Sequence, residues 1–131
     1  MEPLQIKISD STPGIILDKK SNTFEISGRS LPEEALAFYK PVLEWLRNYQ
    51  GEPNKSTEFV FKLEYINSAS VRALNDILAI LESIYMKGLN VVIIWKYNHD
   101  DNEIKETGEE FAEIYKMPFQ HEGYFDSQLN V

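Results

Sequence analysis

The spacing of hydrophobic residues changes repeatedly along this chain, and each change of period predicts a new element of secondary structure. Hydrophobic and polar residues alternate in three short stretches near the N-terminus, which predicts one short strand followed by a hairpin. The polar segment 18–22 separates the second stretch from the third and suits a turn. The three predicted strands cover residues 4–8, 15–17 and 24–26.

Three more strands are predicted further along the chain. Segment 57–65 is rich in aromatic and β-branched residues, and its alternate positions place four large apolar side chains on one side. These four are Phe59, Phe61, Leu63 and Tyr65. Segment 89–95 is almost continuously apolar, which is typical of a strand covered on both faces and favours a central place in the sheet. A last short strand is expected to end near Tyr124.

A first helix is predicted between the third and fourth strands. Ser30 is followed three residues later by Glu33, with Pro32 between them, and this is the pattern of a capping box with proline in the first turn. We therefore expect the helix to begin at Ser30. Apolar residues then recur at three- and four-residue spacing until Gly51 and the residues after it stop the run.

Two further helices are predicted from the same helical spacing. An apolar stripe from Val71 to Tyr85 predicts a helix that ends at 87–88, where lysine and glycine stand. Segment 103–116 predicts an acidic helix. Its inner side is expected to carry Ile104, Phe111, Ile114 and Tyr115.

The elements follow one another in the order βββαβαβαβ, which predicts a mixed sheet with helices packed on it and right-handed crossovers between parallel strands. The fold class is α/β. With 131 residues the chain is expected to form a single domain, 1–131. Its size and element order are compatible with the STAS-like fold of anti-sigma-factor antagonists, and a fold alone does not assign a function.

Composition narrows the function classes. The chain has no cysteine, so disulfides, thiolate metal sites and cysteine nucleophiles are excluded. Its 13 basic and 21 acidic residues give a net charge of −8, which opposes binding to nucleic acid.

No apolar stretch is long enough to span a membrane and no targeting pattern stands at the N-terminus, so we expect a cytoplasmic protein. Phosphate-binding glycine loops and nucleophile-elbow motifs are absent from the sequence, and no catalytic residue or cofactor is predicted.

The stretch Asn67-Ser68-Ala69-Ser70 stands where a predicted strand passes into the second predicted helix. Free amides and the positive end of the helix dipole point toward such a turn, so a phosphoryl group on Ser68 or Ser70 would be stabilised there and by Arg72 one turn later. The same residues also suit a simpler role, because Asn67 or Ser68 can cap the helix. The residues alone leave both interpretations open, and capping is the more common one.

An acidic run begins with Asp100, Asp101 and Glu103 and holds seven of the 21 acids within 14 residues. Carboxylates bind Mg²⁺ and Ca²⁺, yet the spacing fits no EF-hand loop, and the later glutamates follow the solvent side of a helix. A solvated helix is the simplest interpretation. A docking surface for a basic partner and a metal site are the alternatives, and no metal is predicted.

Taken together in chain order, these stretches resemble the SiaC family of bacterial regulatory phosphoproteins. The resemblance covers roughly residues 11 to 120 and rests on a combination of short motifs. These motifs are Ser11-Thr12-Pro13, Gly28-Arg29-Ser30-Leu31-Pro32-Glu33, Phe38-Tyr39, Trp45-Leu46, Tyr65-Ile66-Asn67-Ser68-Ala69-Ser70, Trp95-Lys96-Tyr97 with Asp100-Asp101, and Gly108-Glu109-Glu110-Phe111.

The resemblance implies a non-enzymatic, STAS-like signalling switch. Such a protein is phosphorylated by a dedicated Ser/Thr kinase and dephosphorylated by a PP2C-type phosphatase, and its unmodified form binds and activates a diguanylate cyclase, in c-di-GMP and biofilm signalling. The family's phosphoacceptor is typically a threonine that falls on Ser68 here, with Ser70 as the second candidate. The partner-binding residues would then be Asn67, Ser68, Ala69, Ser70 and Arg72.

Two other functions compete with this one. A constitutive adaptor that is never modified would bind its partner through the same surface. A small metal-dependent hydrolase would use Asp100, Asp101 and Glu103 as its ligands. Neither accounts for Asn67-Ser68-Ala69-Ser70 at a helix start as well as the switch does.

Overall fold

The computed structural model describes residues 1–125, which form six strands and three helices. Their order confirms the predicted βββαβαβαβ arrangement and the α/β class. The strands are β1 (Leu4–Ile6), β2 (Gly14–Asp18), β3 (Thr23–Ser30), β4 (Ser56–Ile66), β5 (Asn90–Asn98) and β6 (Phe119–Tyr124). The helices are α1 (Ala35–Gly51), α2 (Ser68–Met86) and α3 (Asn102–Ile114). Within residues 1–125, no helix is both long and apolar enough to span a membrane.

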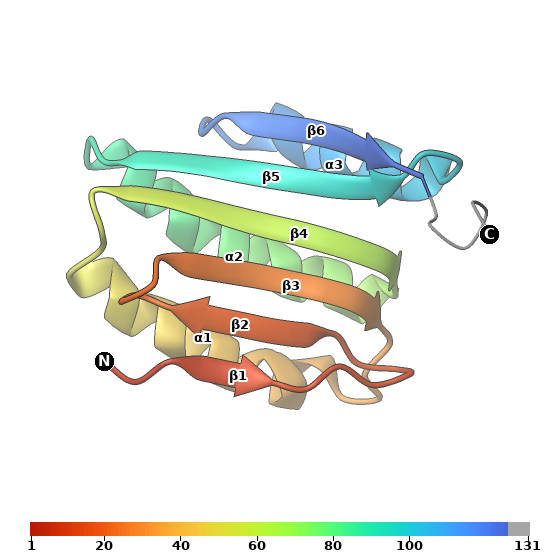
Figure 1. Ribbon diagram of the computed structural model, residues 1–131, viewed down its shortest axis with the longest axis horizontal. Coiled ribbons are helices and arrows are strands. Elements are labelled where there is room, and N and C mark those ends of the chain that lie inside the picture. The colour runs from red at the N-terminus through yellow and green to blue at the C-terminus, as the bar shows by residue number, and fades with distance from the viewer. Residues whose placement is uncertain (126–131) are drawn as a thin grey trace.

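All six strands lie side by side in chain order in one mixed sheet. The first three pair antiparallel, whereas β3, β4, β5 and β6 pair parallel. Each helix therefore carries the chain from one parallel strand to its neighbour in the same direction across the sheet. Right-handed crossovers that all step in one direction place their helices on one face, and Figure 1 shows α1, α2 and α3 together behind the sheet.

The hydrophobic core lies between the sheet and these three helices. Every second residue of the inner strands points toward the helices and is buried. Apolar residues of α1 and α2 close the core from the other side, and the two helices pack against each other. The largest side chains with almost no exposed surface are Trp95, Tyr39, Tyr49, Phe24, Phe59 and Phe61.

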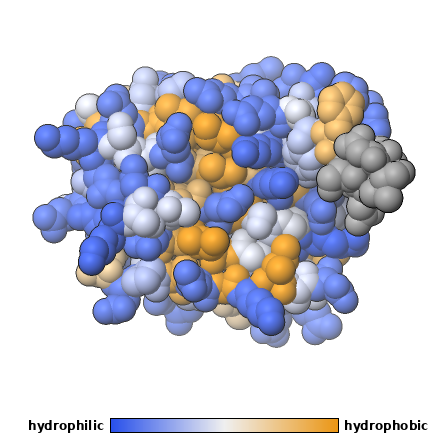
Figure 2. All heavy atoms as spheres, in the orientation of Figure 1, coloured by the Kyte–Doolittle hydropathy of each residue, from blue (hydrophilic) through white to orange (hydrophobic). Residues whose placement is uncertain are grey.

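No helix within residues 1–125 covers the other face of the sheet, so the expectation that segment 89–95 is covered on both faces was wrong. Val92 of β5 is half-buried on this open face. Ile94 is only 8% exposed, because Val60 and Gln120 flank it on the neighbouring strands. Figure 2 views this face and shows hydrophobic side chains gathered between polar ones.

The first helix begins at Ala35, so the predicted start at Ser30 was wrong. Ser30 is the last residue of β3 and pairs with Ile66 of β4. Its hydroxyl points into the core, and the residue before the helix, Glu34, makes no side-chain cap. Strand pairing and buried hydrogen bonds with distant residues hold Ser30 in the sheet, so its hydroxyl does not serve the local capping pattern.

Tyr65 also departs from its expected position. The register of β3 against β4 shifts between Gly28 and Arg29, so that Gly28 pairs with Leu63 while Arg29 pairs with Tyr65. This extra residue in β4 turns Tyr65 away from the core, and its side chain is 45% exposed. The Arg29 guanidinium stacks over the Tyr65 ring, with 5.9 Å from Cζ to the ring centroid.

The third helix packs on β5 and β6 through Ile104 and Phe111, as expected. Ile114, which we expected on the same side, is 63% exposed. The helix ends at this residue, and Tyr115 already has extended backbone angles. Tyr115 instead bonds to α2 through its hydroxyl, which lies 2.7 Å from the Asn75 side-chain oxygen.

Candidate functional site

The turn from β4 into α2 is held by an asparagine cap. Asn67 has extended backbone angles, and its side-chain oxygen accepts a hydrogen bond of 2.9 Å from the Ser70 amide. The Asn67 carbonyl also accepts the first helical bond, from the Val71 amide. This confirms that the stretch caps the helix, and it assigns the cap to Asn67 rather than to Ser68.

Ser68 is the first residue of α2, and its side chain is exposed. Within residues 1–125 its hydroxyl has no hydrogen-bond partner, because Asn67 already serves as the cap. Ala69 and Arg72 are exposed as well, and Arg72 stands one helical turn beyond Ser68 on the same side of the helix. The structure thus presents Ser68, Ala69 and Arg72 together at the positive end of the α2 dipole.

Ser70 has the opposite environment, with none of its surface exposed. The hydroxyl of Ser30 donates a 2.7 Å hydrogen bond to the Ser70 hydroxyl, which in turn donates to the Ser30 carbonyl at 3.2 Å. The Tyr39 hydroxyl lies 2.6 Å from Ser30 Oγ and must donate to it, because the only proton of that serine goes to Ser70. We call Ser30, Tyr39 and Ser70 the hydroxyl cluster.

Burial raises the pKa of Tyr39, and its hydrogen bonds to Ser30 and Ser70 oppose that rise in part. Tyr39 therefore stays protonated, as a donor to Ser30 requires. No sequence motif indicated the roles of Ser30 and Tyr39. Local patterns could not have found them, because Ser30 and Ser70 are 40 residues apart in the chain.

Three loops meet at this edge of the sheet. The Asn67 amide donates to the Ser30 carbonyl at 3.0 Å, and the Asn67 side-chain nitrogen donates to the Pro32 carbonyl at 3.5 Å. The Leu31 amide donates to the Ser11 carbonyl at 2.7 Å. The β1–β2 loop, the β3–α1 loop and the β4–α2 turn are therefore linked to one another by hydrogen bonds.

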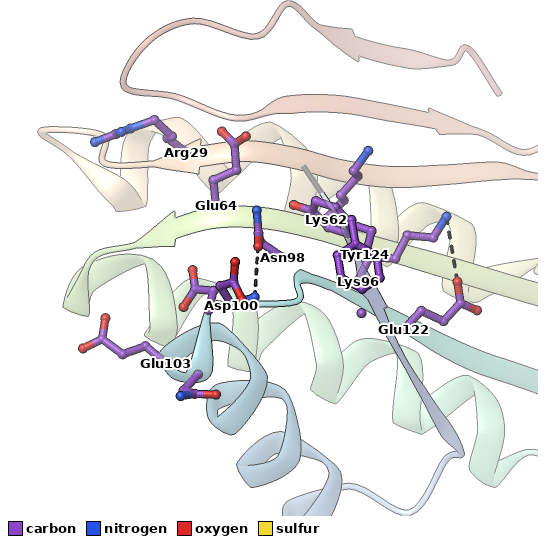
Figure 3. Close-up of a pocket in the computed structure, with 13 residues that line it drawn as sticks. Arg29, Lys62, Glu64, Lys96, Asn98, Asp100, Glu103, Glu122 and Tyr124 are labelled. Carbon is purple, nitrogen blue, oxygen red and sulfur yellow. Dashed lines mark hydrogen bonds and ion pairs between the residues drawn. The ribbon is translucent and has the colours of Figure 1, made fainter. Parts of the chain in front are cut away.

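An open basin lies on the uncovered face of the sheet, beside the ends of β4, β5 and β6 (Figure 3). Its charges are mixed and partly paired. Lys96 lies 4.0 Å from Glu122, and the Lys62 ammonium lies 4.9 Å from the centre of the Tyr124 ring. The basin is lined by Arg29, Lys62, Glu64, Lys96, Asn98, Asp100, Asp101, Asn102, Glu103, Glu122, Gly123, Tyr124 and Phe125.

The acidic residues of the predicted alternative metal site lie on this basin. The Asp101 carboxylate accepts a hydrogen bond of 3.1 Å from the Ile104 amide and caps α3. The Asp100 amide is bonded to the Asn98 side chain at 3.0 Å. In the part of the chain that the structure describes, no three His, Asp or Glu side chains come together as metal ligands.

The model of the family of SiaC regulatory phosphoproteins matches residues 6–124, which is nearly the whole chain. The chain belongs to the SiaC family. An uncharacterised protein of Pseudomonas aeruginosa strain UCBPP-PA14 is 30% identical over 119 residues, which cover 91% of this chain and 94% of that protein. Family membership confirms the resemblance drawn from the sequence.

Two solved structures agree with this membership. Apo-SiaC of Pseudomonas aeruginosa matches with a TM-score of 0.84 at 28% identity, over 94% of this chain and all of that one. SiaC in the complex of the Pseudomonas aeruginosa diguanylate cyclase SiaD with its activator SiaC matches with a TM-score of 0.87 at 29% identity. That match covers 92% of this chain and 99% of the other. Free and cyclase-bound members of the SiaC family thus share the fold described above.

Proposed function

We propose that this protein is a non-enzymatic signalling switch of the cytoplasm and that phosphorylation at Ser68 controls its binding to a diguanylate cyclase. The unmodified form binds and activates the cyclase, and so raises c-di-GMP and promotes biofilm formation. The observation that carries the proposal is the Ser68 hydroxyl at the first turn of α2, exposed and without a hydrogen-bond partner among residues 1–125, in a member of a regulatory phosphoprotein family.

A cyclase as the output partner is supported by the complex of Pseudomonas aeruginosa SiaC with SiaD, in which SiaC is the activator. The proposed docking surface consists of Asn67, Ser68, Ala69 and Arg72 at the carboxyl edge of the sheet. Ser70 lies beneath this surface and supports it from inside.

Phosphorylation of Ser68 requires a kinase, and its reversal requires a phosphatase, for which we propose a PP2C-type enzyme. The kinase uses a nucleoside triphosphate as donor. A bond forms between Ser68 Oγ and the γ-phosphorus, and the bond from that phosphorus to the bridging oxygen breaks. The nucleoside diphosphate leaves, and the hydroxyl proton passes to a base of the kinase.

The physical effect of the modification is a local change of charge. A phosphoryl group adds about two negative charges at pH 7 and is strongly hydrated. The first amides of α2 and the Arg72 guanidinium stabilise those charges on the free protein. The same charges weaken binding to a cyclase surface that is complementary to an uncharged serine, so the cyclase releases the phosphorylated form.

Intact mass with site mapping tests this proposal on protein purified from its native cells in the presence of phosphatase inhibitors. We expect a population heavier by one phosphoryl group, with the group on Ser68. A Ser68→Ala variant should lose this population, whereas Ser56→Ala, which alters an exposed serine at the other end of β4, should keep it. Unmodified protein under every growth condition would instead favour the constitutive adaptor.

A further inference from the structure

The two serines of the turn are two residues apart in the chain, yet they occupy opposite environments. Ser68 is exposed, and Ser70 has no exposed surface. A kinase that recognises the turn by its sequence would meet two hydroxyl groups of the same chemistry. Some feature of the fold must therefore decide between them, and the hydroxyl cluster is the feature that contacts Ser70.

We infer that the hydroxyl cluster of Ser30, Tyr39 and Ser70 determines the site of phosphorylation within the turn by holding Ser70 inside the protein, so that of these two serines Ser68 is the acceptor. This inference rests on the proposed function, because it presupposes that the turn is phosphorylated. Tyr39 and Ser30 are positioning residues in this role, and neither touches the phosphate donor.

Three hydrogen bonds of Ser70 oppose its movement from the core to the surface. Its hydroxyl accepts from Ser30 Oγ and donates to the Ser30 carbonyl, while its amide donates to the Asn67 side chain. Moving Ser70 outward breaks all three bonds at once. It also leaves the Ser30 and Tyr39 hydroxyls buried with fewer partners, which is unfavourable in a core.

The cluster also makes a phosphate on Ser70 unfavourable in the folded state. About two negative charges would lie in the core beside the Tyr39 hydroxyl, and buried charges require close compensation by opposite charges or many donors. Ser30 and Tyr39 offer only their two hydroxyl protons within the cluster. A phosphate at Ser70 thus requires the turn to open, whereas a phosphate at Ser68 does not.

The test uses Ser30→Ala and Tyr39→Phe, each in the native sequence and in a Ser68→Ala background. The variants are expressed in the native cells, so that the cellular kinase is the probe, and phosphate at positions 68 and 70 is mapped. Ser68→Ala alone should carry no phosphate at Ser70. Adding Ser30→Ala should produce it, because that change removes the direct donor to Ser70, and adding Tyr39→Phe should produce less.

A control for Tyr39→Phe is available on the same helix, α1. Tyr49 is buried like Tyr39, and its hydroxyl lies 2.7 Å from the hydroxyl of Thr57 in β4. Tyr49→Phe therefore removes the same atom far from the turn, together with its bond to Thr57 and the bond of 3.1 Å that the Asn54 amide donates to it. In the Ser68→Ala background it should leave Ser70 unmodified, which separates the local effect from a general loss of stability.

Hydrogen exchange gives a second readout that needs no kinase. Loss of one hydrogen bond of the cluster should speed exchange of the Ser70 and Val71 amides by about five- to tenfold in Ser30→Ala or Tyr39→Phe. Tyr49→Phe should leave these two amides as they are. Both amides are bonded to Asn67 in the closed turn, so they report its opening directly.

The outcomes separate this inference from the proposed function. Phosphate on Ser70 in Ser68→Ala alone would overturn the inference, as would unchanged exchange and an unmodified Ser70 in both cluster variants. Phosphate on Ser68 in the native sequence, together with either of these results, would leave the proposed function intact. Native protein without phosphate in any growth condition would overturn both.

Discussion

The α-carbon of Gly108 rests against the indole ring of Trp95, so closely that a Cβ at this position would overlap ring atoms. The Trp95 indole nitrogen also donates a hydrogen bond of 2.9 Å to the Ile104 carbonyl, one turn earlier in α3. Glycine inside a helix is unfavourable relative to alanine by roughly 1 kcal/mol. Its presence here is explained by the close approach of α3 to β5.

Gly108→Ala should therefore destabilise the protein although alanine is the better helix former. The added methyl group forces the ring or the helix to move, and overpacking of this kind typically costs about 1–3 kcal/mol. Gly51→Ala is the control, because Gly51 lies in the last turn of α1 with nothing within 4 Å of the added Cβ. Urea unfolding measures both, and equal stability of the two variants would contradict the packing argument.

Replacement of Ser68 should separate the two states of the proposed switch. Ser68→Asp places a negative charge at the docking surface, so we expect cyclase recovery from native cells to fall by at least about tenfold. Ser68→Ala should bind as the unmodified protein does and keep the cyclase active. Affinity purification followed by assay of c-di-GMP synthesis measures both effects, with Ser56→Asp as the control for added charge. Equal recovery of cyclase by the two Ser68 variants would contradict the switch.

Loss of the asparagine cap should weaken the start of α2. Asn67→Ala removes the acceptor of the Ser70 amide, and a lost N-cap typically costs about 1 kcal/mol. Asn67→Asp keeps an acceptor oxygen in the same place and should retain most of the stability. Thermal unfolding of the three proteins gives the comparison, and the prediction fails if alanine and aspartate are equivalent.

Stability should decline in alkaline solution, in part through Tyr39. Burial raises the pKa of Tyr39 above its ordinary value of 10.0, so the folded protein holds this proton more tightly than the unfolded chain does. The tighter binding of this proton stabilises the folded state in full below pH 10, and this stabilisation is lost as the pH rises from there through the folded-state pKa of Tyr39. In Tyr39→Phe the decline above pH 10 should be shallower. Denaturant unfolding at a series of pH values checks this, and parallel curves for both proteins would refute it.

Local pattern predicted the elements well and failed where distant residues intervene. Asn67 caps α2 within its own turn, so a motif four residues long was sufficient to find the cap. Ser30 also stands in a good capping pattern, yet pairing with β4 and the bond to Ser70 hold it in the sheet. Tyr65 follows the alternation of its strand until a bulge in the pairing with β3 turns it outward. Neither the long-range contacts of Ser30 nor the bulge beside Tyr65 can be recognised from the neighbouring residues in the sequence.

The order of the elements, the mixed α/β class, the family resemblance and the turn that carries Ser68 could all be predicted from the amino-acid sequence. Periodicity, turn residues and caps act between residues near one another in the chain, and a sequence displays those directly. Only the folded chain shows that α1, α2 and α3 lie on one face and that Ser70 is buried while Ser68 is exposed. The first property follows from the parallel pairing of β3, β4, β5 and β6 in chain order. The second follows from the pairing of β3 with β4, which brings Ser30 to Ser70 across 40 residues of chain. Contacts of this kind exist only once the sheet has formed.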